Sequence, residues 1–547
     1  MAPIPLAELL NRETAVSRRD VAAAVLVSGA ANTAILAIIN AAAAAAAHGR
    51  LDLQLLLIFG VAMTLYVLGL GYTFDAATGA IEQALARLRV RLMERIAGSE
   101  LLLLHKVGKP RIFQTITQDT SLISESQGLL VAAGHSVVMV ACTGIYVLTV
   151  SLPAFLGIAA VMAAGILLYL GRSRHMGRLL AESSAEEVRF VGMAGDLVDG
   201  LKEIKLSHAR RDALLDEVAD AAVRLRRLKV QATTLYNRNA VFSQCFFYLL
   251  IAIIVFVLPR LLNGFGPSVP ELVATVLFVI GPLSTIVTAV PAFTKANGAA
   301  ASLMALEREI DHEAGQQPPD RPAPTPLSFA HEIACRGIEF RYPGGSEDGA
   351  FHIGPIDLAI PHGEITIFIG GNGSGKTTLL KVLAGLYTPT AGSLGLDGQP
   401  VPVGRMPEYR ELFGAIFSDF HLFRKLYGVP AAADAIAAQF SQLHIADKVA
   451  YGKDGFSTTQ LSTGQRKRVA MAVALLEDRP VLIFDEWAAE QDPEFREYFY
   501  HKLLPDLMEA GKTLLVATHD DRFFDVADTI VKLELGRVQS IHRKGQP

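Results

Sequence analysis

Cysteines and charged residues are scarce in this chain. Only three cysteines occur in 547 residues, and no two of them have the Cys-x-x-Cys spacing. Cys142 and Cys245 sit in apolar runs, so the sequence predicts neither a disulfide framework nor a zinc site built on cysteine. Charged residues make up 19% of the chain, and the formal net charge is −4. Because the chain has no overall basic field, nucleic acid is not expected as a partner.

Apolar residues are abundant and form long runs in the first three hundred positions. They make up 51% of the chain. A helix needs about 20 apolar residues to cross the hydrocarbon core of a membrane. Six stretches qualify or nearly so: 21–47, 53–74, 129–150, 153–170, 240–262 and 272–293. The sequence therefore predicts a membrane domain of six helices over residues 1–310.

The connections between these spans are of two kinds. Three are short turns, whereas the second-to-third and fourth-to-fifth connections run to roughly fifty to seventy residues with helical periodicity, far beyond ordinary loops. We expect long helices that extend out of the membrane. Basic residues gather in these two connections: Arg87, Arg89, Arg91, Arg95, Lys106, Lys109, Arg111, Arg172, Arg174, Arg178, Arg189, Lys202, Lys205, Arg224, Arg226, Arg227 and Lys229. The positive-inside rule then predicts a multi-pass protein of the cytoplasmic membrane, with both termini and the C-terminal domain in the cytoplasm.

The N-terminus allows a second interpretation. Ser17-Arg18-Arg19 before an apolar stretch, with the Ala41–Ala47 run behind it, is also typical of a secretory signal. The apolar run is too long for a signal core, and cleavage would leave five spans with the C-terminal domain outside the cell. A permanent first membrane helix is the better interpretation.

The chain changes character after the last apolar run. Residues 311–330 form a proline-rich linker that cannot continue a helix. In residues 331–547, strand-like runs at 365–369, 481–484 and 513–517 alternate with helical patterns. Such alternation predicts an α/β domain with a parallel sheet covered by helices.

A glycine-rich phosphate loop follows the first of these strands and opens a helix. Its pattern, G-x-x-x-x-G-K-T, places backbone N–H groups and a helix N-terminus around a phosphate. Lys376 is expected to neutralise the β- and γ-phosphates, and the Thr377 hydroxyl to bind Mg²⁺. The candidate nucleotide-binding residues here are Gly370, Gly371, Asn372, Gly373, Ser374, Gly375, Lys376, Thr377 and Thr378.

An acidic pair ends the second strand. Asp485 is predicted to hold Mg²⁺ through water, and Glu486 to orient and polarise the water that attacks the γ-phosphate. The pair follows the pentapeptide Leu461-Ser462-Thr463-Gly464-Gln465 by about twenty residues, and both lie downstream of the phosphate loop in the same domain. That order argues against an incidental acidic turn.

The pentapeptide resembles the signature of ATP-binding cassette (ABC) proteins. In that family the signature caps the γ-phosphate of ATP held by a second copy of the domain, so the resemblance implies a homodimer that closes on ATP and Mg²⁺. The whole chain resembles an ABC exporter half-transporter of the type I fold: six transmembrane helices fused ahead of one α/β nucleotide-binding domain. Leu461, Ser462, Thr463, Gly464 and Gln465 are thereby candidate nucleotide contacts.

Further site residues follow from this resemblance. His519, after the third strand, would sense the γ-phosphate as a polar group, and Tyr342 would stack on adenine unless it only packs in the core. Asp492 falls where the family has an aspartate at the dimer seam, although a solvated acidic turn fits as well. Most ABC domains have a glutamine where Ser418 stands. Either the Ser418 hydroxyl acts through a water, or Asp419 replaces the missing contact.

Three segments resemble one subgroup, the exporters of cyclic peptides and peptide siderophores of the pyoverdine, syringomycin and microcin J25 type. They are Ile416–Phe423, Leu476–Pro480 and Phe484–Pro493. The expected function is ATP-driven export of a mature cyclic, lasso or siderophore-type peptide by alternating access. A lipid or amphipathic-drug flippase is the alternative, because the same fold serves both. A channel or regulator without transport would predict a damaged ATP site, whereas Lys376, Asp485, Glu486 and His519 are all present.

Polar residues in the apolar spans are candidates for a substrate cavity. Such a group in a membrane bundle must find either a ligand or a partner helix. Asn32, Asn40, His135 and Gln244 are the candidates, with hydrogen bonds between helices as the competing explanation.

Overall fold

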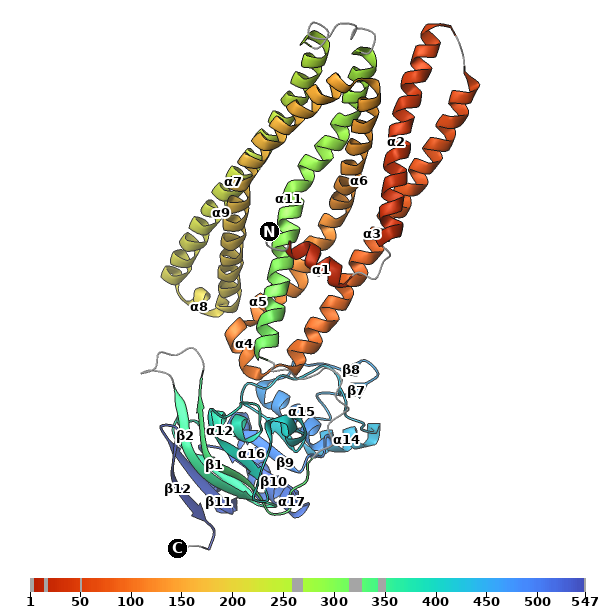
Figure 1. Ribbon diagram of the computed structural model, residues 1–547. Coiled ribbons are helices and arrows are strands. Elements are labelled where there is room, and N and C mark those ends of the chain that lie inside the picture. Colours follow the sequence, from red (N-terminus) through yellow and green to blue (C-terminus); the bar gives the residue numbers. More distant parts are fainter. Residues whose placement is uncertain are drawn as a thin grey trace. The chain divides into compact units, whose positions relative to one another are not determined.

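The computed structural model describes residues 4–13, 18–49, 52–257, 269–313, 327–342 and 351–545. Two compact units make up the chain (Figure 1). The first comprises Met1–Ala97 and Pro110–His312, and the second comprises Gly98–Lys109 and Glu313–Pro547. Most of the proline-rich linker and the apolar residues 258–262 lie outside the described residues.

The first unit is entirely helical. α3 and α7 continue well past the ends of their predicted spans, and α9 begins well before its span, so the long connections are helices, as the sequence predicts. The helices are α1 (Pro5–Glu13), α2 (Arg18–Ala47), α3 (Leu53–Gly98), α5 (Lys109–Gln114), α6 (Thr120–Val150), α7 (Leu152–Asp199), α8 (Leu201–Leu206), α9 (His208–Ala252) and α11 (Val269–Glu313).

Five helical segments of the described residues are long and apolar enough to cross a membrane. They are Arg19–Ala46, Leu53–Gly98, Lys109–Val150, His208–Val257 and Val269–Asp311. The fourth predicted span, 153–170, falls in α7, where Leu152–Gly165 is a shorter apolar segment. α2 therefore extends as one helix through the apolar run that is also typical of a secretory signal.

Serine caps mark the starts of α7 and α9. The Ser151 side chain accepts a hydrogen bond from the Ala154 amide at 3.4 Å, and Pro153 lies in the first turn. Ser207 accepts from the Arg210 amide at 3.3 Å in the same way. Both serines have extended backbone angles, as N-cap residues do. Ser151 thus ends the short turn between the third and fourth predicted spans, and Ser207 separates α8 from α9 within the second long connection.

Two of the polar residues singled out in the spans join α2 to α6. The Asn32 amide contacts Met139 Sδ at 2.9 Å, and the Asn40 amide donates to the Tyr146 hydroxyl at 3.2 Å. Thr33 and Thr143 hydroxyls lie 3.4 Å apart on the same seam. For Asn32 and Asn40, the structure therefore shows the helix–helix alternative rather than a contact with a cavity.

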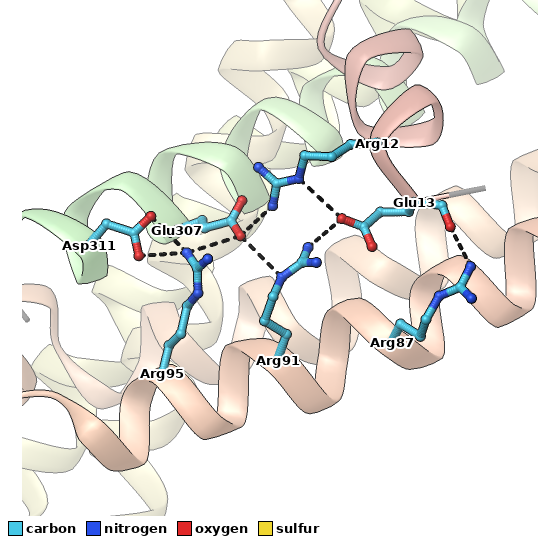
Figure 2. A network of polar contacts seen from close by, with 7 residues as sticks. All are labelled: Arg12, Glu13, Arg87, Arg91, Arg95, Glu307 and Asp311. Atoms are coloured by element: carbon cyan, nitrogen blue, oxygen red, sulfur yellow. Dashed lines mark hydrogen bonds and ion pairs between the residues drawn. The ribbon is translucent and has the colours of Figure 1, made fainter. Parts of the chain in front are cut away.

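A charged network fixes α1 against α3 and α11 (Figure 2). The Glu13 and Glu307 side chains are only 5% exposed, so each needs cationic partners. Arg12 bridges both, lying 2.5 Å from Glu307 Oε1 and 3.2 Å from Glu13 Oε1. The other members of this α1 network are Arg87, Arg91, Arg95 and Asp311. Three helices far apart in the sequence are thereby tied together.

The second unit is built on two large sheets, and β7 and β8 form a separate two-stranded sheet. Its six-stranded sheet has the order β12-β11-β3-β10-β9-β6, and its four-stranded antiparallel sheet has the order β2-β1-β4-β5. The strands are β1 (Glu332–Arg341), β2 (His352–Pro361), β3 (Ile365–Ile369), β4 (Ala391–Leu396), β5 (Gln399–Pro400), β6 (Phe413–Ile416), β7 (Tyr451–Gly452), β8 (Gly455–Phe456), β9 (Val481–Asp485), β10 (Thr513–Ala517), β11 (Thr529–Glu534) and β12 (Arg537–Arg543).

Helices, together with Gly98–Lys109 from the first long connection, complete this unit. The helices are α4 (Leu101–Val107), α12 (Lys376–Leu383), α13 (Met406–Arg410), α14 (Ala433–Gln442), α15 (Thr463–Leu476), α16 (Pro493–Tyr498) and α17 (Leu504–Glu509). Leu101 and Leu102 pack against the core that contains Phe340 and Tyr387. Glu100 accepts a hydrogen bond from the Thr388 hydroxyl at 2.8 Å. The middle of the first long connection therefore belongs to the α/β unit.

The central strands explain where the site lies. β9 and β10 are buried along their whole length, and β3 nearly so, as expected for parallel strands covered on both faces. β10 pairs in parallel with both β3 and β9. The carboxyl ends of these three strands consequently share one edge, where the phosphate loop, the acidic pair and His519 follow.

Candidate nucleotide-hydrolysis site

The phosphate loop occupies the turn between β3 and α12. Gly370 and Gly375 have φ angles of 147° and 104°, which favour glycine. A Cβ at Gly370 would lie 2.2 Å from the Leu533 carbonyl oxygen, so no other residue fits there. The Ser374 hydroxyl is buried without a partner among the described residues. An unpaired donor beside a helix N-terminus fits a phosphate.

Lys376 lies at the centre of the site. Its side chain is 5% exposed, and Nζ donates to the Gly370 carbonyl at 3.0 Å. Nζ also lies 3.0 Å from His519 Nε2 and 3.8 Å from Glu486 Oε1. Burial lowers the pKa of Lys376, and the charges of Glu486 and Asp485 only partly offset that effect. The ammonium group is therefore poorly hydrated and close to both predicted catalytic groups, Glu486 and His519.

Asp485 and Thr377 form a pair suited to magnesium. The Thr377 hydroxyl donates to Asp485 Oδ2 at 2.8 Å, and the Ser418 amide donates to the same oxygen at 3.4 Å. Asp485 Oδ1 is buried and has no partner in the described part of the chain. Burial raises the pKa of Asp485. A hydroxyl and an unpaired carboxylate oxygen are ligands that Mg²⁺ accepts beside nucleotide phosphates, so the residues present fit this ion.

Glu486 and His519 face one cavity. Glu486 Oε1 lies 3.0 Å from His519 Nε2, and both residues line a cavity of about 310 Å³. Glu486 has the left-handed backbone angles φ 49° and ψ 33°, unusual for a residue other than glycine. The strand end thus turns sharply, and the carboxylate points toward Lys376 and His519 rather than along β9.

The signature pentapeptide starts α15. Ser462 accepts a hydrogen bond from the Gln465 amide at 3.3 Å, while Gln465 Oε1 accepts from the Ser462 amide at 3.1 Å. This reciprocal pair is a capping box. Ser462 and Thr463 are exposed, and the Gly464 carbonyl accepts from Gln491 at 3.1 Å. The signature is therefore presented on the surface and anchored to the loop after Glu486.

The remaining predicted contacts are more dispersed. Tyr342 lies beside α12, with its hydroxyl 3.1 Å from that of Thr378 and its ring edge-on to Phe340. Asp419 contacts Lys381 at 3.2 Å and is largely exposed. Asp492 caps α16, accepting from the Phe495 amide at 2.8 Å. Of the two residues proposed to replace the glutamine, Ser418 contacts Asp485 directly through its amide.

Sequence reasoning missed Lys467. This lysine is 3% exposed, and Nζ donates to the Glu486 carbonyl oxygen at 2.9 Å. Lys467, Met471 and Ala474 are all buried on α15, at the i, i+4, i+7 spacing of one helix face. A lysine in line with an apolar face was the signal that could have identified it.

Comparisons with known proteins give a consistent result. The family model for ABC transporters matches residues 353–489, and the family model for the ABC transporter transmembrane region matches residues 21–285. The ATP-binding protein SyrD of Pseudomonas syringae pv. syringae is 33% identical over 535 residues, covering 94% of this chain and 92% of that protein.

Other similar proteins match less completely or by fold alone. The ATP-dependent lipid A-core flippase of Alkalilimnicola ehrlichii is 34% identical over 49% of this chain and 46% of its own length. A bacterial Atm1-family ABC exporter with ATP bound superposes with a TM-score of 0.78 at 19% identity, covering 97% of this chain and 96% of that one.

Proposed function

The chain belongs to the ABC transporter family, as an exporter half-transporter whose ATP hydrolysis is coupled to transport, and we propose that it exports a mature peptide of the cyclic, lasso or siderophore type. The protein is an integral membrane protein with the type I exporter fold and binds ATP through its α/β unit. We place it in the cytoplasmic membrane with both termini and the α/β unit in the cytoplasm, because the basic residues gather in the two long connections.

The observation that carries the peptide proposal is the extent of similarity. The relative SyrD matches along 94% of the chain, whereas the lipid A-core flippases of Alkalilimnicola ehrlichii and Burkholderia orbicola match over 49% and 70% of it. The membrane helices, which meet the substrate, are thus included in the first match. Resemblance of Ile416–Phe423 and Phe484–Pro493 to the peptide exporters points the same way. The flippase relatives keep lipid export as the second candidate.

The residues of the site have complementary roles in ATP hydrolysis. Gly370–Thr378 cradle the phosphates, and Lys376 moves from its contacts with Glu486 and His519 to the β- and γ-phosphates. Mg²⁺ bound at Thr377 and Asp485 would neutralise phosphate charge. Glu486 orients the attacking water, and His519 donates toward the γ-phosphate. Tyr342 stacks on the adenine, while Ser418 or Asp419 replaces the usual glutamine near Asp485.

Two chains complete each site. Ser462 and Thr463 are exposed in the single chain, so they are available to contact ATP held by the Lys376 loop of a second copy. Leu461, Gly464 and Gln465 shape this helix start, and Asp492 lies at the seam between the copies. ATP bound in both sites stabilises the closed homodimer, and hydrolysis releases it. We expect closure to reach the membrane helices through α4, which packs on the α/β core and follows α3 along the chain after Ser99 and Glu100.

ATPase activity in lipid nanodiscs tests the proposal. Cyclic or lasso peptides and lipid A are titrated separately, beside a Glu486→Gln variant. We expect micromolar peptide to stimulate hydrolysis and the variant to show no stimulated rate. Stimulation by lipid A alone would move the protein to the flippase class.

A further inference from the structure

Lys467 is a buried cation without a buried anion. Its side chain is 4% exposed, and the nearest carboxylate oxygen, Glu490 Oε1, lies 3.7 Å away on a side chain that is 47% exposed. A buried ammonium group is costly unless a polar group receives its hydrogen bonds. Here the receiving group is the Glu486 carbonyl oxygen at 2.9 Å. The cation thus acts on the backbone of the residue proposed to orient the attacking water.

The backbone amide and carbonyl of Glu486 both form hydrogen bonds with residues of other elements. Its amide donates to the Ala517 carbonyl of β10 at 3.0 Å, and its carbonyl accepts from Lys467 of α15. Left-handed angles at a residue other than glycine persist only where the surroundings enforce them. Fixing the two flanking peptide planes sets the direction of the Cα–Cβ bond, and with it the place of the carboxylate beside His519.

The contact between α15 and the loop after β9 is reciprocal. The buried Trp487 indole donates to the Lys467 carbonyl at 3.0 Å, and Gln491 donates to the Gly464 carbonyl at 3.1 Å. A Cβ at Gly464 would lie 2.7 Å from the Glu490 carbonyl oxygen, so helix and loop are in close backbone approach. The signature helix and the Glu486 turn therefore form one packed piece.

We propose that Lys467 is a positioning residue for ATP hydrolysis: it holds the Glu486 turn in its left-handed conformation and ties that turn to the signature helix. The inference rests on the role proposed above for Glu486. In the dimer the signature of one chain contacts the ATP of the other site. Lys467 then links the docking of that ATP on Ser462 to the placement of the chain's own hydrolytic carboxylate.

The test compares three variants with a matched control. Lys467→Met keeps the length and the apolar stem but cannot donate a hydrogen bond, whereas Lys467→Arg keeps charge and donors. Lys512→Met is the control, because Lys512 also donates to the carbonyl of a residue with positive φ, Asp478, at 3.1 Å. Lys512 lies just before the start of β10, at the opposite end of that strand from the site residues. Glu486→Gln is measured in the same nanodiscs.

We expect Lys467→Met to lower kcat at least about tenfold, since a lost charged hydrogen bond has that size, with KM for ATP changed less than about twofold. Lys467→Arg should recover most of kcat, and Lys512→Met should stay within about twofold of the wild type. Thermal unfolding with bound ATP should not separate Lys467→Met from Lys512→Met. A merely structural lysine would instead lower stability and ATP binding together, without rescue by arginine.

Two results overturn the inference. One is a Lys467→Met protein with wild-type kcat while Glu486→Gln is inactive, which removes the positioning role and leaves the proposed function intact. The other is a parallel loss of kcat, ATP binding and thermal stability in both Lys467 variants. A Glu486→Gln protein that still hydrolyses ATP would contradict the proposed role of Glu486. That outcome is distinct from a failure of the Lys467 inference, because it is measured in a different variant.

Discussion

At the scale of single residues, the two oxygens of Asp485 have different surroundings. Oδ2 accepts hydrogen bonds from Thr377 and Ser418, while Oδ1 is buried without a partner among the described residues. An Asp485→Asn substitution would remove the charge and place an amide donor where the metal ligand is expected. Because ligand charge sets the affinity for hard cations, hydrolysis should fall at least about tenfold, with a higher Mg²⁺ requirement.

A magnesium titration of ATPase activity checks this. A substitution of Lys544 is the control, because it also removes one charge but its Nζ contacts the Asp525 carbonyl and, within the described part of the chain, none of the site residues named above. Lys544→Gln should keep the wild-type titration curve. An Asp485→Asn protein with an unchanged curve would exclude this carboxylate as a metal ligand.

Gly464 is the residue whose size is most constrained within the signature. The oxygen 2.7 Å from a Cβ added there belongs to the backbone of Glu490, so no side-chain rotation relieves the overlap. We expect Gly464→Ala to destabilise the α/β unit by about 1–3 kcal/mol and to lower hydrolysis. Gly452→Ala is the control, because a Cβ there meets nothing within 4 Å. Equal unfolding temperatures for the two variants would refute the close approach.

At the scale of elements, burial patterns decide what the sequence could predict. β3, β9 and β10 are runs of buried apolar residues, and the phosphate loop has a fixed spacing, so the sequence predicts these strands and the loop. The α1 network could not be predicted from the sequence, because its partners are up to 295 residues apart. No local sequence pattern relates Arg12 to Glu307. The turn at Glu486 was also missed, since left-handed angles on a glutamate depend on contacts from β10 and α15.

The α1 network predicts how the first helix responds to acid. Burial alone would raise the pKa of Glu13, but hydrogen bonds from Arg91 and Arg12 outweigh it and lower the pKa below the ordinary 4.5. A lowered pKa means that the stabilisation is complete above pH 4.5 and is lost as pH falls through the lower value of the folded chain. Glu13→Gln lacks this dependence.

The measurement is the unfolding temperature of the wild type and of Glu13→Gln between about pH 3 and 7. Above pH 4.5 the variant should be less stable by about 1–3 kcal/mol, the size of a lost charged hydrogen bond. The difference should shrink at the acid end. A difference that is constant with pH would show that Glu13 acts without its charge.

At the scale of the whole molecule, the proposed homodimer divides each ATP site between two chains. The phosphate loop, Asp485, Glu486 and His519 lie together. Ser462 and Thr463 are exposed, and the neighbouring Gly464 carbonyl accepts a hydrogen bond from Gln491 of the same chain. We therefore expect particles of two chains, each of 58.7 kDa, in lipid nanodiscs. With Glu486→Gln and ATP, two nucleotides should remain bound per particle.

Native mass spectrometry of the nanodisc particles reports both numbers. A Lys376→Ala chain, which lacks the phosphate-binding ammonium group, should still pair through its membrane helices but retain no ATP. Single-chain particles that hydrolyse ATP at the wild-type rate would contradict the shared site.

Vectorial transport is the most direct test of peptide export. The wild-type protein and the Glu486→Gln variant are reconstituted in liposomes, and ATP with a fluorescent cyclic or lasso peptide is added outside, where only outward-facing α/β units can use it. The account predicts ATP-dependent accumulation of peptide inside wild-type liposomes and none with Glu486→Gln. Movement of a labelled lipid without any peptide accumulation would contradict it.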